Sequence, residues 1–349
     1  MYREGNLVKI VSFKWSLGLF LLFLLILLAF LSIGHGSVNI SFLDIMRLLF
    51  QKDSEEAYIV WEIRLPRTIG AILTGASLGV SGAVMQNVLR NPLASPFTLG
   101  ISHGAAFGAA FAIIVLGAGK TFNVGPVGFS ILHGVPVVFS AFCGALLTVL
   151  IILGLSLLRS LSPQAIILAG VALSSLFTSA TMFLQYFSDE VRVASTVFWT
   201  FGDVGKAGWQ EIKIMAITFC ISFALLWLNR WNYNAMLWGD ETAKNLGTNP
   251  KFLRIFSLLI CALLTAVPTA FLGIIGFVGL ISPHIIRLLI GNDYTLLIPF
   301  SAMAGAGLLL ASDLLARTIL SPIVLPVGII TSFIGAPVFL SLLLGRKRF

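Results

Sequence analysis

The chain has 349 residues, of which 58% are hydrophobic and only 10% are charged. A soluble globular protein carries about 25% charged residues, so this composition excludes a soluble enzyme or binding domain and indicates a multi-pass membrane protein. The net charge of +8 does not indicate nucleic-acid binding, because membrane proteins keep Lys and Arg on cytoplasmic loops for reasons of topology. We therefore expect one integral membrane domain over residues 1–349.

The N-terminal region predicts a first membrane helix that is retained. Residues 1–14 contain basic side chains, and an apolar run follows from Trp15 to Ile33. A signal peptide has a shorter apolar core of about 7–15 residues, whereas this run is long enough to span a bilayer. Residues 1–14 are therefore predicted to be a cytoplasmic segment.

Charge-free segments predict the membrane helices, since one span needs about 20 mostly apolar residues. The long segments without Asp, Glu, Lys or Arg are 15–43, 68–89, 91–119, 121–158, 160–188, 214–229, 255–286, 294–312 and 318–345. The 255–286 segment is too long for one helix and contains Pro268 and Gly273, so we divide it, with a short second helix over about 276–290. The 121–158 segment opens on TFNVGPVGFS, whose Gly and Pro predict a loop. The predicted fold class is therefore all-α, with about ten transmembrane helices.

The distribution of charge predicts that both termini are cytoplasmic. Ten helices place the two ends of the chain on one side of the membrane, and the basic tail at 346–348 favours the inner side. The largest inner loop then covers 231–251 and contains GDETAKNLG. Asp240 is predicted to cap a short helix there, and Gly247 to end it. On these residues alone, such a helix fits a solvated connector and a docking surface equally well.

The segment from Arg64 to Ala105 combines close packing with polar residues. It opens with RLPR, continues as a charge-free helix rich in small residues, and ends in the polar turn NPLASP. Ala71, Gly75, Gly79 and Ala83 recur every four residues and share one helix face, which predicts close contact with another helix. Polar residues at the end of such a helix indicate a partner or a pathway rather than lipid contact.

Three features that suggest chemistry are interpreted as structural. The GKT at 119–121 lacks the glycine five places earlier that a phosphate-binding loop needs, and a membrane helix precedes it. The cysteines lie in apolar runs without a CxxC pair, as small buried side chains do. A metal site needs ligands that converge, but the histidines are scattered over positions His35, His103, His133 and His284. We therefore predict no metal site, cofactor site or ATPase within this chain.

Four motifs in order resemble the FecCD/cobalamin-type permease family. They are RLPR…GASLGVSGAVMQ…NPLASPFTLGISHGA, the loop GDETAKNLG, and the C-terminal pair GFVGLISPHIIRLLIG and LPVGIITSFIGAPVFLSLLLG. Members of this family are membrane subunits of type II ABC importers for iron–siderophore, haem and cobalamin uptake. The resemblance covers the chain from about residue 15. It implies a permease that moves an iron chelate into the cytoplasm, with cobalamin, haem or an oxyanion as alternative cargoes.

The resemblance also implies an assembly in the cytoplasmic membrane. Two permease copies, in a homodimer or in a heterodimer with a paralogue, would form the pathway at their interface, lined by the fifth and tenth helices. Two ATP-binding-cassette ATPase subunits would drive transport, and an extracytoplasmic substrate-binding protein would deliver the cargo. ATP would be used by the ATPase partner, so this chain is not expected to be an enzyme.

Family roles can be assigned to the matching residues of this sequence. The outer arginines Arg64, Arg67 and Arg317 resemble positions that pair with acids of the binding protein, and anchoring at the membrane interface is the alternative for each. The residues that resemble the ATPase contact are Asp240, Glu241, Lys244, Asn245 and Leu246. The residues that resemble the inner gate of the pathway are Asn91, Leu93, Ser162 and Pro163.

Two other classes of protein are weighed against the importer. An ion-driven secondary transporter needs intramembrane acids or broken helices that hold the coupling ion, and nearly all of the predicted spans are free of Asp and Glu. An intramembrane enzyme needs a nucleophile and a base that face each other, but Ser282 and His284 point about 200° apart on one helix. The sequence therefore favours the importer permease.

Overall fold

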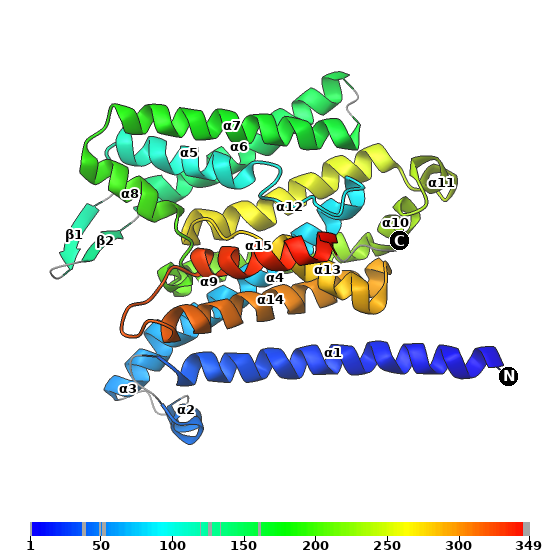
Figure 1. Ribbon diagram of the computed structural model, residues 1–349, viewed down its shortest axis with the longest axis horizontal. Coiled ribbons are helices and arrows are strands. Elements are labelled where there is room, and N and C mark those ends of the chain that lie inside the picture. Colours follow the sequence, from blue (N-terminus) through cyan, green and yellow to red (C-terminus); the bar gives the residue numbers. More distant parts are fainter. Residues whose placement is uncertain are drawn as a thin grey trace.

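The computed structural model describes residues 2–344 except 37–39, 49, 51–53, 119, 125–127, 133, 160 and 161. Nearly all of the described chain is helical, and most helices run roughly side by side in one bundle (Figure 1). The predictions made for Gly119, His133 and the tail at 346–348 fall outside the described residues.

The described chain contains ten apolar helices, as many as the charge-free segments predict. Those long enough to cross a membrane are α1 (Tyr2–Gly34), α4 (Leu65–Val88), α6 (Val135–Arg159), α7 (Pro163–Tyr186), α9 (Trp209–Leu228), α12 (Pro250–Leu272) and α14 (Tyr294–Thr318). Shorter apolar helices are α5 (Ile101–Ile114), α13 (Val278–Ile290) and α15 (Val327–Leu344). The predicted all-α membrane fold is therefore confirmed.

The remaining elements lie at the two ends of the bundle (Figure 1). One end carries α2 (Phe42–Leu48), α3 (Glu55–Tyr58), β1 (Lys120–Val124), β2 (Gly128–Leu132), α8 (Glu190–Thr200) and the 3₁₀ turn η2 (Val204–Lys206). The other end carries α10 (Arg230–Met236) and α11 (Asp240–Asn245). We call the first the outer end and the second the inner end, after the topology predicted from charge. The start of α1 and the end of α15 both lie at the inner end; which face of the membrane it meets stays a prediction.

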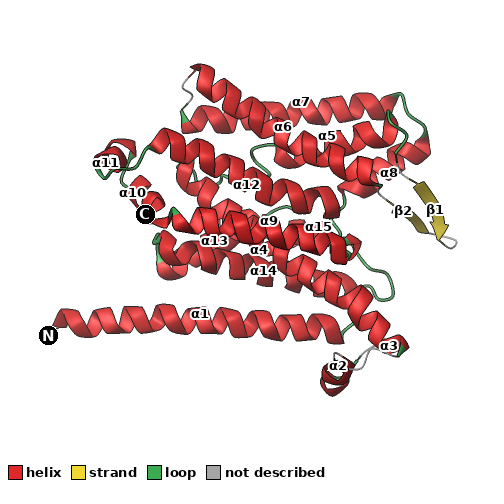
Figure 2. Ribbon diagram, turned by 180° about the vertical axis from the view of Figure 1, so that it is seen from behind, coloured by secondary structure: helices red, strands yellow, loops and turns green. Residues whose placement is uncertain are grey.

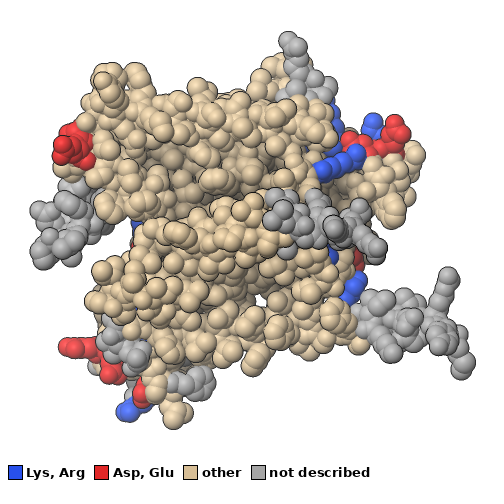
Figure 3. Space-filling view, viewed as in Figure 1, with Lys and Arg blue, Asp and Glu red and all other residues tan. Residues whose placement is uncertain are grey.

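Charged side chains gather at both ends of the face shown in Figure 3, and the surface between them is almost free of charge. Such an uncharged band matches what a lipid bilayer requires of the surface that it touches. The arrangement agrees with a multi-pass membrane protein.

The prediction of a loop over TFNVGPVGFS is wrong. These residues belong to an antiparallel hairpin in which Lys120 pairs with Leu132, and Val124 pairs with Gly128. The strands contain the β-branched or aromatic residues Thr121, Phe122, Val124, Phe129 and Ile131, a composition that favours extended chain. Residues 120–124 and 128–132 are therefore strands, and residues 125–127 lie outside the described part of the chain.

Several helices extend beyond their charge-free segments, and the outer ends of α4 and α14 are two examples. The helix predicted to begin at 68 begins at Glu55, because α3, the π-helical turn η1 (Ile59–Arg64) and α4 form one continuous helix. Likewise, α14 continues past 312 and takes Asp313 and Arg317 into its last turns. The charge-free rule therefore underestimates the length of a helix such as α14, whose Asp313 and Arg317 pair inside the protein.

Helix α4 is the central helix of the bundle, and most of its side chains are buried (Figure 2). A Cβ atom added to Gly75 would collide with the backbone of Gly305 in α14, and one added to Gly82 would collide with the backbone of Gly279 in α13. The small-residue face predicted for α4 thus packs against α14. In α14 the close approach is made by the backbone of Gly305 and, one turn earlier, by that of Ser301, which a Cβ atom on Gly79 would meet.

The chain between α12 and α13 is broken, as predicted from the length of this segment. Gly273 follows α12 with φ +83°, and Phe277 precedes α13 with φ +65°, both in the left-handed region. The extended residues between them form a β-bridge from Ile274 to Phe201. A turn of irregular backbone at membrane depth is tolerated only where the protein itself provides hydrogen-bond partners.

Replacing Gly82 by alanine tests the close approach of α4 and α13. We expect Gly82→Ala to destabilise the protein by about 1–3 kcal/mol or more, because backbone atoms rather than a flexible side chain must move. Gly154→Ala is the control, since a Cβ atom there has nothing within 4 Å, and we expect a change within about 1 kcal/mol. Thermal denaturation of the purified variants in detergent measures both. Equal midpoints would contradict the packing described here.

Candidate functional site

A buried charge cluster occupies the outer end of the bundle. Arg67, in the first turn of α4, donates from Nε (2.9 Å) and Nη2 (2.8 Å) to the Asp313 carboxylate of α14. Arg317 lies one turn further along α14, with its Nε 3.1 Å from the same carboxylate. Asp313 is completely buried, and Asp203 lies 3.3 Å from Arg67. One buried aspartate thus holds two guanidinium groups.

Arg317 of this cluster and the neighbouring Arg64 also bind the last carbonyl groups of α1. Arg64 donates to the carbonyl groups of Ile33 (2.6 Å) and Gly34 (3.1 Å). Arg317 donates to the Ser32 carbonyl at 3.0 Å. The last four carbonyl groups of a helix have no partner within it, and cations near them are favourable. The cluster therefore ties the outer ends of α1, α4 and α14 together.

These contacts bear on the docking role predicted for Arg64, Arg67 and Arg317. Arg64 and Arg317 are buried, and only 12% of the Arg67 side chain is exposed. Their guanidinium groups bind other parts of the same chain and present little surface to a partner. Their contacts are structural, and the docking role stays a prediction.

Lys206 lies next to this cluster in η2. Burial lowers the pKa of Lys206 to about 8. The nearby carboxylate of Asp203 raises this pKa, but its effect is smaller than that of burial. Its ammonium group donates to the carbonyl of Phe201 at 3.4 Å. The outer end therefore contains an amine whose charge changes within one unit of physiological pH.

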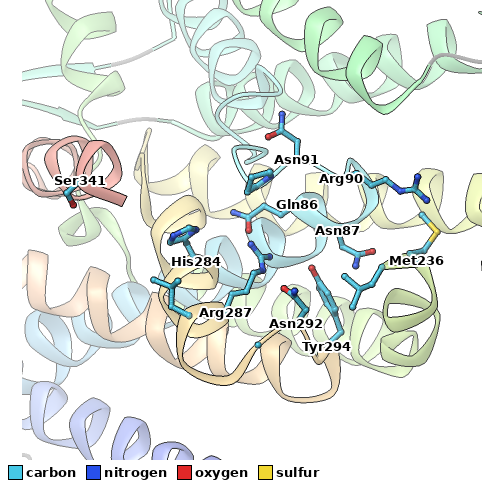
Figure 4. Close-up of a pocket in the computed structure, with 14 residues that line it drawn as sticks. Gln86, Asn87, Arg90, Asn91, Met236, His284, Arg287, Asn292, Tyr294 and Ser341 are labelled. Atoms are coloured by element: carbon cyan, nitrogen blue, oxygen red, sulfur yellow. The ribbon is translucent and has the colours of Figure 1, made fainter. Parts of the chain in front are cut away.

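A cavity of about 620 Å³ lies at the inner end, between the end of α4 and the helices α10, α13, α14 and α15 (Figure 4). Polar side chains come to it from α4 (Gln86 and Asn87), from the turn after α4 (Asn91) and from α13 (His284 and Arg287). The polar end of α4, singled out in the sequence, thus faces a cavity. The contribution of α13 was missed, because nothing in the SPHIIR motif shows where that short helix lies.

The predicted gate residues fall into two separate places. Asn91 lines the inner cavity, and its side-chain oxygen accepts a hydrogen bond from the Leu93 backbone N–H at 2.8 Å. Ser162 caps α7 by accepting from the Ala165 N–H at 3.3 Å, and Pro163 occupies the first turn. Leu93, Ser162 and Pro163 do not line this cavity among the described residues. A gate formed by both pairs stays a prediction.

The predicted coupling helix is present as α11, but its cap differs from the prediction. Gly239 is the N-cap, and Asp240 is the first helical residue. The Asp240 carboxylate accepts from Arg90 at 2.7 Å and from Arg254 at 3.2 Å. Arg254 also donates to the Val88 carbonyl at 2.8 Å. Asp240 therefore joins α11 to the end of α4 and the start of α12.

The other residues predicted to contact an ATPase are exposed. Leu246 is 64% exposed, and the apolar ring of Trp238 beside it is 77% exposed. These two side chains and Trp231 border a groove of about 310 Å³. Glu241, Lys244 and Asn245 also lie at the surface. Exposed apolar side chains next to polar ones are typical of an interaction surface.

A ten-helix membrane bundle with a polar cavity and an exposed helix at one end is the architecture of a multi-pass permease. The model of the FecCD transport family matches residues 24–345, and the chain belongs to this family.

Similar proteins include several permeases. An ABC transporter permease protein of Methanocaldococcus jannaschii is 52% identical, over 95% of this chain and 95% of the relative. The hemin transport system permease of Yersinia pestis is 37% identical, over 94% and 95% of the two chains. The Fe(3+)-citrate import system permease YfmE of Bacillus subtilis is 37% identical, over 95% of each. These relatives are transport subunits.

A solved structure supports the fold. A metal-chelate type ABC transporter in an inward-facing conformation has a TM-score of 0.81 and 31% sequence identity, and the match covers 96% of this chain and 99% of that one. The bundle described here is therefore an ABC permease fold.

Replacing Asp313 by asparagine tests the outer charge cluster. We expect Asp313→Asn to destabilise the protein by about 3–5 kcal/mol, because two buried guanidinium groups lose their shared counter-charge. The control is Asp189→Asn at the exposed Asp189–Arg192 pair, where asparagine still caps α8 and the expected loss is within about 1 kcal/mol. Thermal denaturation in detergent compares the two. A loss as small for Asp313 as for Asp189 would contradict the cluster's structural role.

Proposed function

We propose that the chain is the permease subunit of an importer that carries an iron chelate into the cytoplasm. The observation that carries this proposal is the full-length match to the FecCD transport family, with relatives named for Fe(3+)-citrate and hemin transport. Two copies of the chain would form the pathway, with a homodimer favoured over a heterodimer with a paralogue. The cargo would arrive from an extracytoplasmic binding protein at the outer end.

Other cargoes are the main alternative. A vitamin B12 import system permease of Citrobacter koseri is 38% identical over 83% of this chain, which keeps cobalamin in consideration beside haem. An ion-coupled secondary transporter would need an intramembrane acid that can hold the coupling ion. Asp313 is the acid within α14. Asp313 is already bound by Arg67 and Arg317, so its carboxylate does not offer a site for a coupling ion.

The proposed contact with the ATPase uses α11 and the residue that follows it. The exposed side chains of Glu241, Lys244, Asn245 and Leu246 would meet the partner. Asp240 would contribute indirectly, because its pairs with Arg90 and Arg254 hold α11 against α4 and α12. Motion of the ATPase at α11 would thereby reach the transmembrane helices. ATP would be bound and hydrolysed by the partner.

Replacing Leu246 by aspartate tests this contact. We expect Leu246→Asp to reduce the amount of ATPase that co-purifies with the permease at least about tenfold, because a charge is forced into an apolar contact. Ile323→Asp is a matched control, since Ile323 is 65% exposed but lies in the loop between α14 and α15, at the outer end. Unchanged co-purification for Leu246→Asp, or an equal loss for both variants, would argue against the assignment of α11.

Uptake by reconstituted vesicles tests the cargo. The permease, its cognate ATPase and its binding protein are supplied with labelled ferric siderophore, haem or cobalamin. We expect ATP-dependent accumulation of the ferric siderophore, and none without ATP. Accumulation of cobalamin or haem alone would overturn the proposal of a siderophore-type iron chelate but keep the importer. Accumulation that follows an imposed ion gradient and not ATP would overturn both.

A further inference from the structure

The inner cavity has a buried floor and an open mouth. Gln86 and Asn87, which form part of the floor, are only 4% and 5% exposed. Arg90, Gly291 and Asn292 border it where the chain is exposed. Its volume, about 620 Å³, lies in the range of about 300–1,000 Å³ that is usual for small-molecule sites. A small ligand can therefore enter from the surface and reach buried polar groups.

Two hydrogen-bond acceptors on the floor lack a partner. The Gln86 side-chain N–H group donates to the Leu280 carbonyl at 3.5 Å, and that of Asn87 donates to the Tyr233 carbonyl at 3.1 Å. The oxygen atoms of both amides are buried without a hydrogen bond among the described residues. A buried acceptor without a partner costs about 1–3 kcal/mol. A ligand that donates hydrogen bonds would remove this cost.

The two arginines that line the cavity differ in their partners. Arg90 is already paired with Asp240. Arg287 comes from α13 and points toward Gln86 (Figure 4). Arg287 has a side-chain hydrogen bond with Tyr294, but none of the ion pairs in the described part of the chain includes it, so its charge is not neutralised by a carboxylate. A guanidinium group binds a carboxylate through two parallel hydrogen bonds, so Arg287 is suited to an acidic ligand.

We propose that this cavity binds a small hydroxycarboxylate. Its carboxylate pairs with Arg287, and its hydroxyl group donates one hydrogen bond, to the amide oxygen of Gln86. A simple carboxylate leaves the Gln86 acceptor without a partner, and a neutral polyol leaves Arg287 without a counter-charge. The site goes beyond the proposed import function, because binding there requires neither a binding protein nor ATP. Since Arg90 forms part of the wall, the site lies against the ion pair that holds α11.

Citrate and tricarballylate test the site, because they differ only in the hydroxyl group. The full-length chain in lipid nanodiscs is titrated with each acid by calorimetry in iron-free buffer. We expect one citrate per chain, bound about tenfold more tightly than tricarballylate, since the hydroxyl group satisfies one buried acceptor. Equal affinities, or no binding of citrate, would overturn the proposal.

Two variants and a control assign the residues. Arg287→Ala should weaken citrate binding about tenfold or more, because a charge-assisted hydrogen bond is lost. Lys251→Ala removes one positive charge from the same end of the bundle, outside this cavity, and should change affinity less than about threefold. Gln86→Leu should reduce the preference for citrate over tricarballylate. Equal losses for Arg287→Ala and Lys251→Ala would show nonspecific attraction of anions and overturn the site; if Gln86→Leu fails to fold, the two acids on the unaltered chain still decide.

Discussion

Close contact between helix backbones is the constraint on which the rest of this structure depends. Lipid tails are as apolar as leucine, so burial of apolar side chains gives little net drive for helices to associate within a membrane. Helix α4 meets this difficulty with glycines at contact points on two sides, against Gly305 of α14 and Gly279 of α13. The same solution recurs where α5 meets α6, with Gly104 against Gly144. Dispersion contacts between backbones then replace the hydrophobic effect.

An arginine–aspartate pair fixes α4 at each end of this close-packed core. At the outer end Arg67 binds Asp313 of α14, and at the inner end Arg90 binds Asp240 of α11. The two pairs differ in burial, because Asp313 is fully buried whereas 38% of the Asp240 side chain is exposed. Removal of one partner of the outer pair is therefore expected to lower the stability of the protein strongly. The inner pair lies in a more solvated place, where an ion pair contributes little stability and can exchange partners.

The sequence predicted the parts of the fold that depend on local pattern. Apolar length gave the ten helices, Pro268 and Gly273 marked the long segment that breaks in two, and the four-residue spacing in α4 indicated its packed face. What it missed depends on distant residues. Arg67 and Asp313 are 246 positions apart, and Arg90 and Asp240 are 150 apart. Single-sequence periodicity has no access to such pairs, so it does not show that Arg67 binds Asp313 or that Asp240 pairs with Arg90 and Arg254.

The packing of α4 also limits where the bundle can move. A glycine backbone seated against another backbone has no flexible side chain between them to absorb sliding, so α4, α13 and α14 behave as one body. In contrast, α7 and α15 expose much of their apolar surface, including Leu168 and Phe333. A transport cycle needs discrete rearrangement of packed elements. Any such rearrangement would therefore leave the contacts of α4 with α13 and α14 intact and involve helices outside this unit.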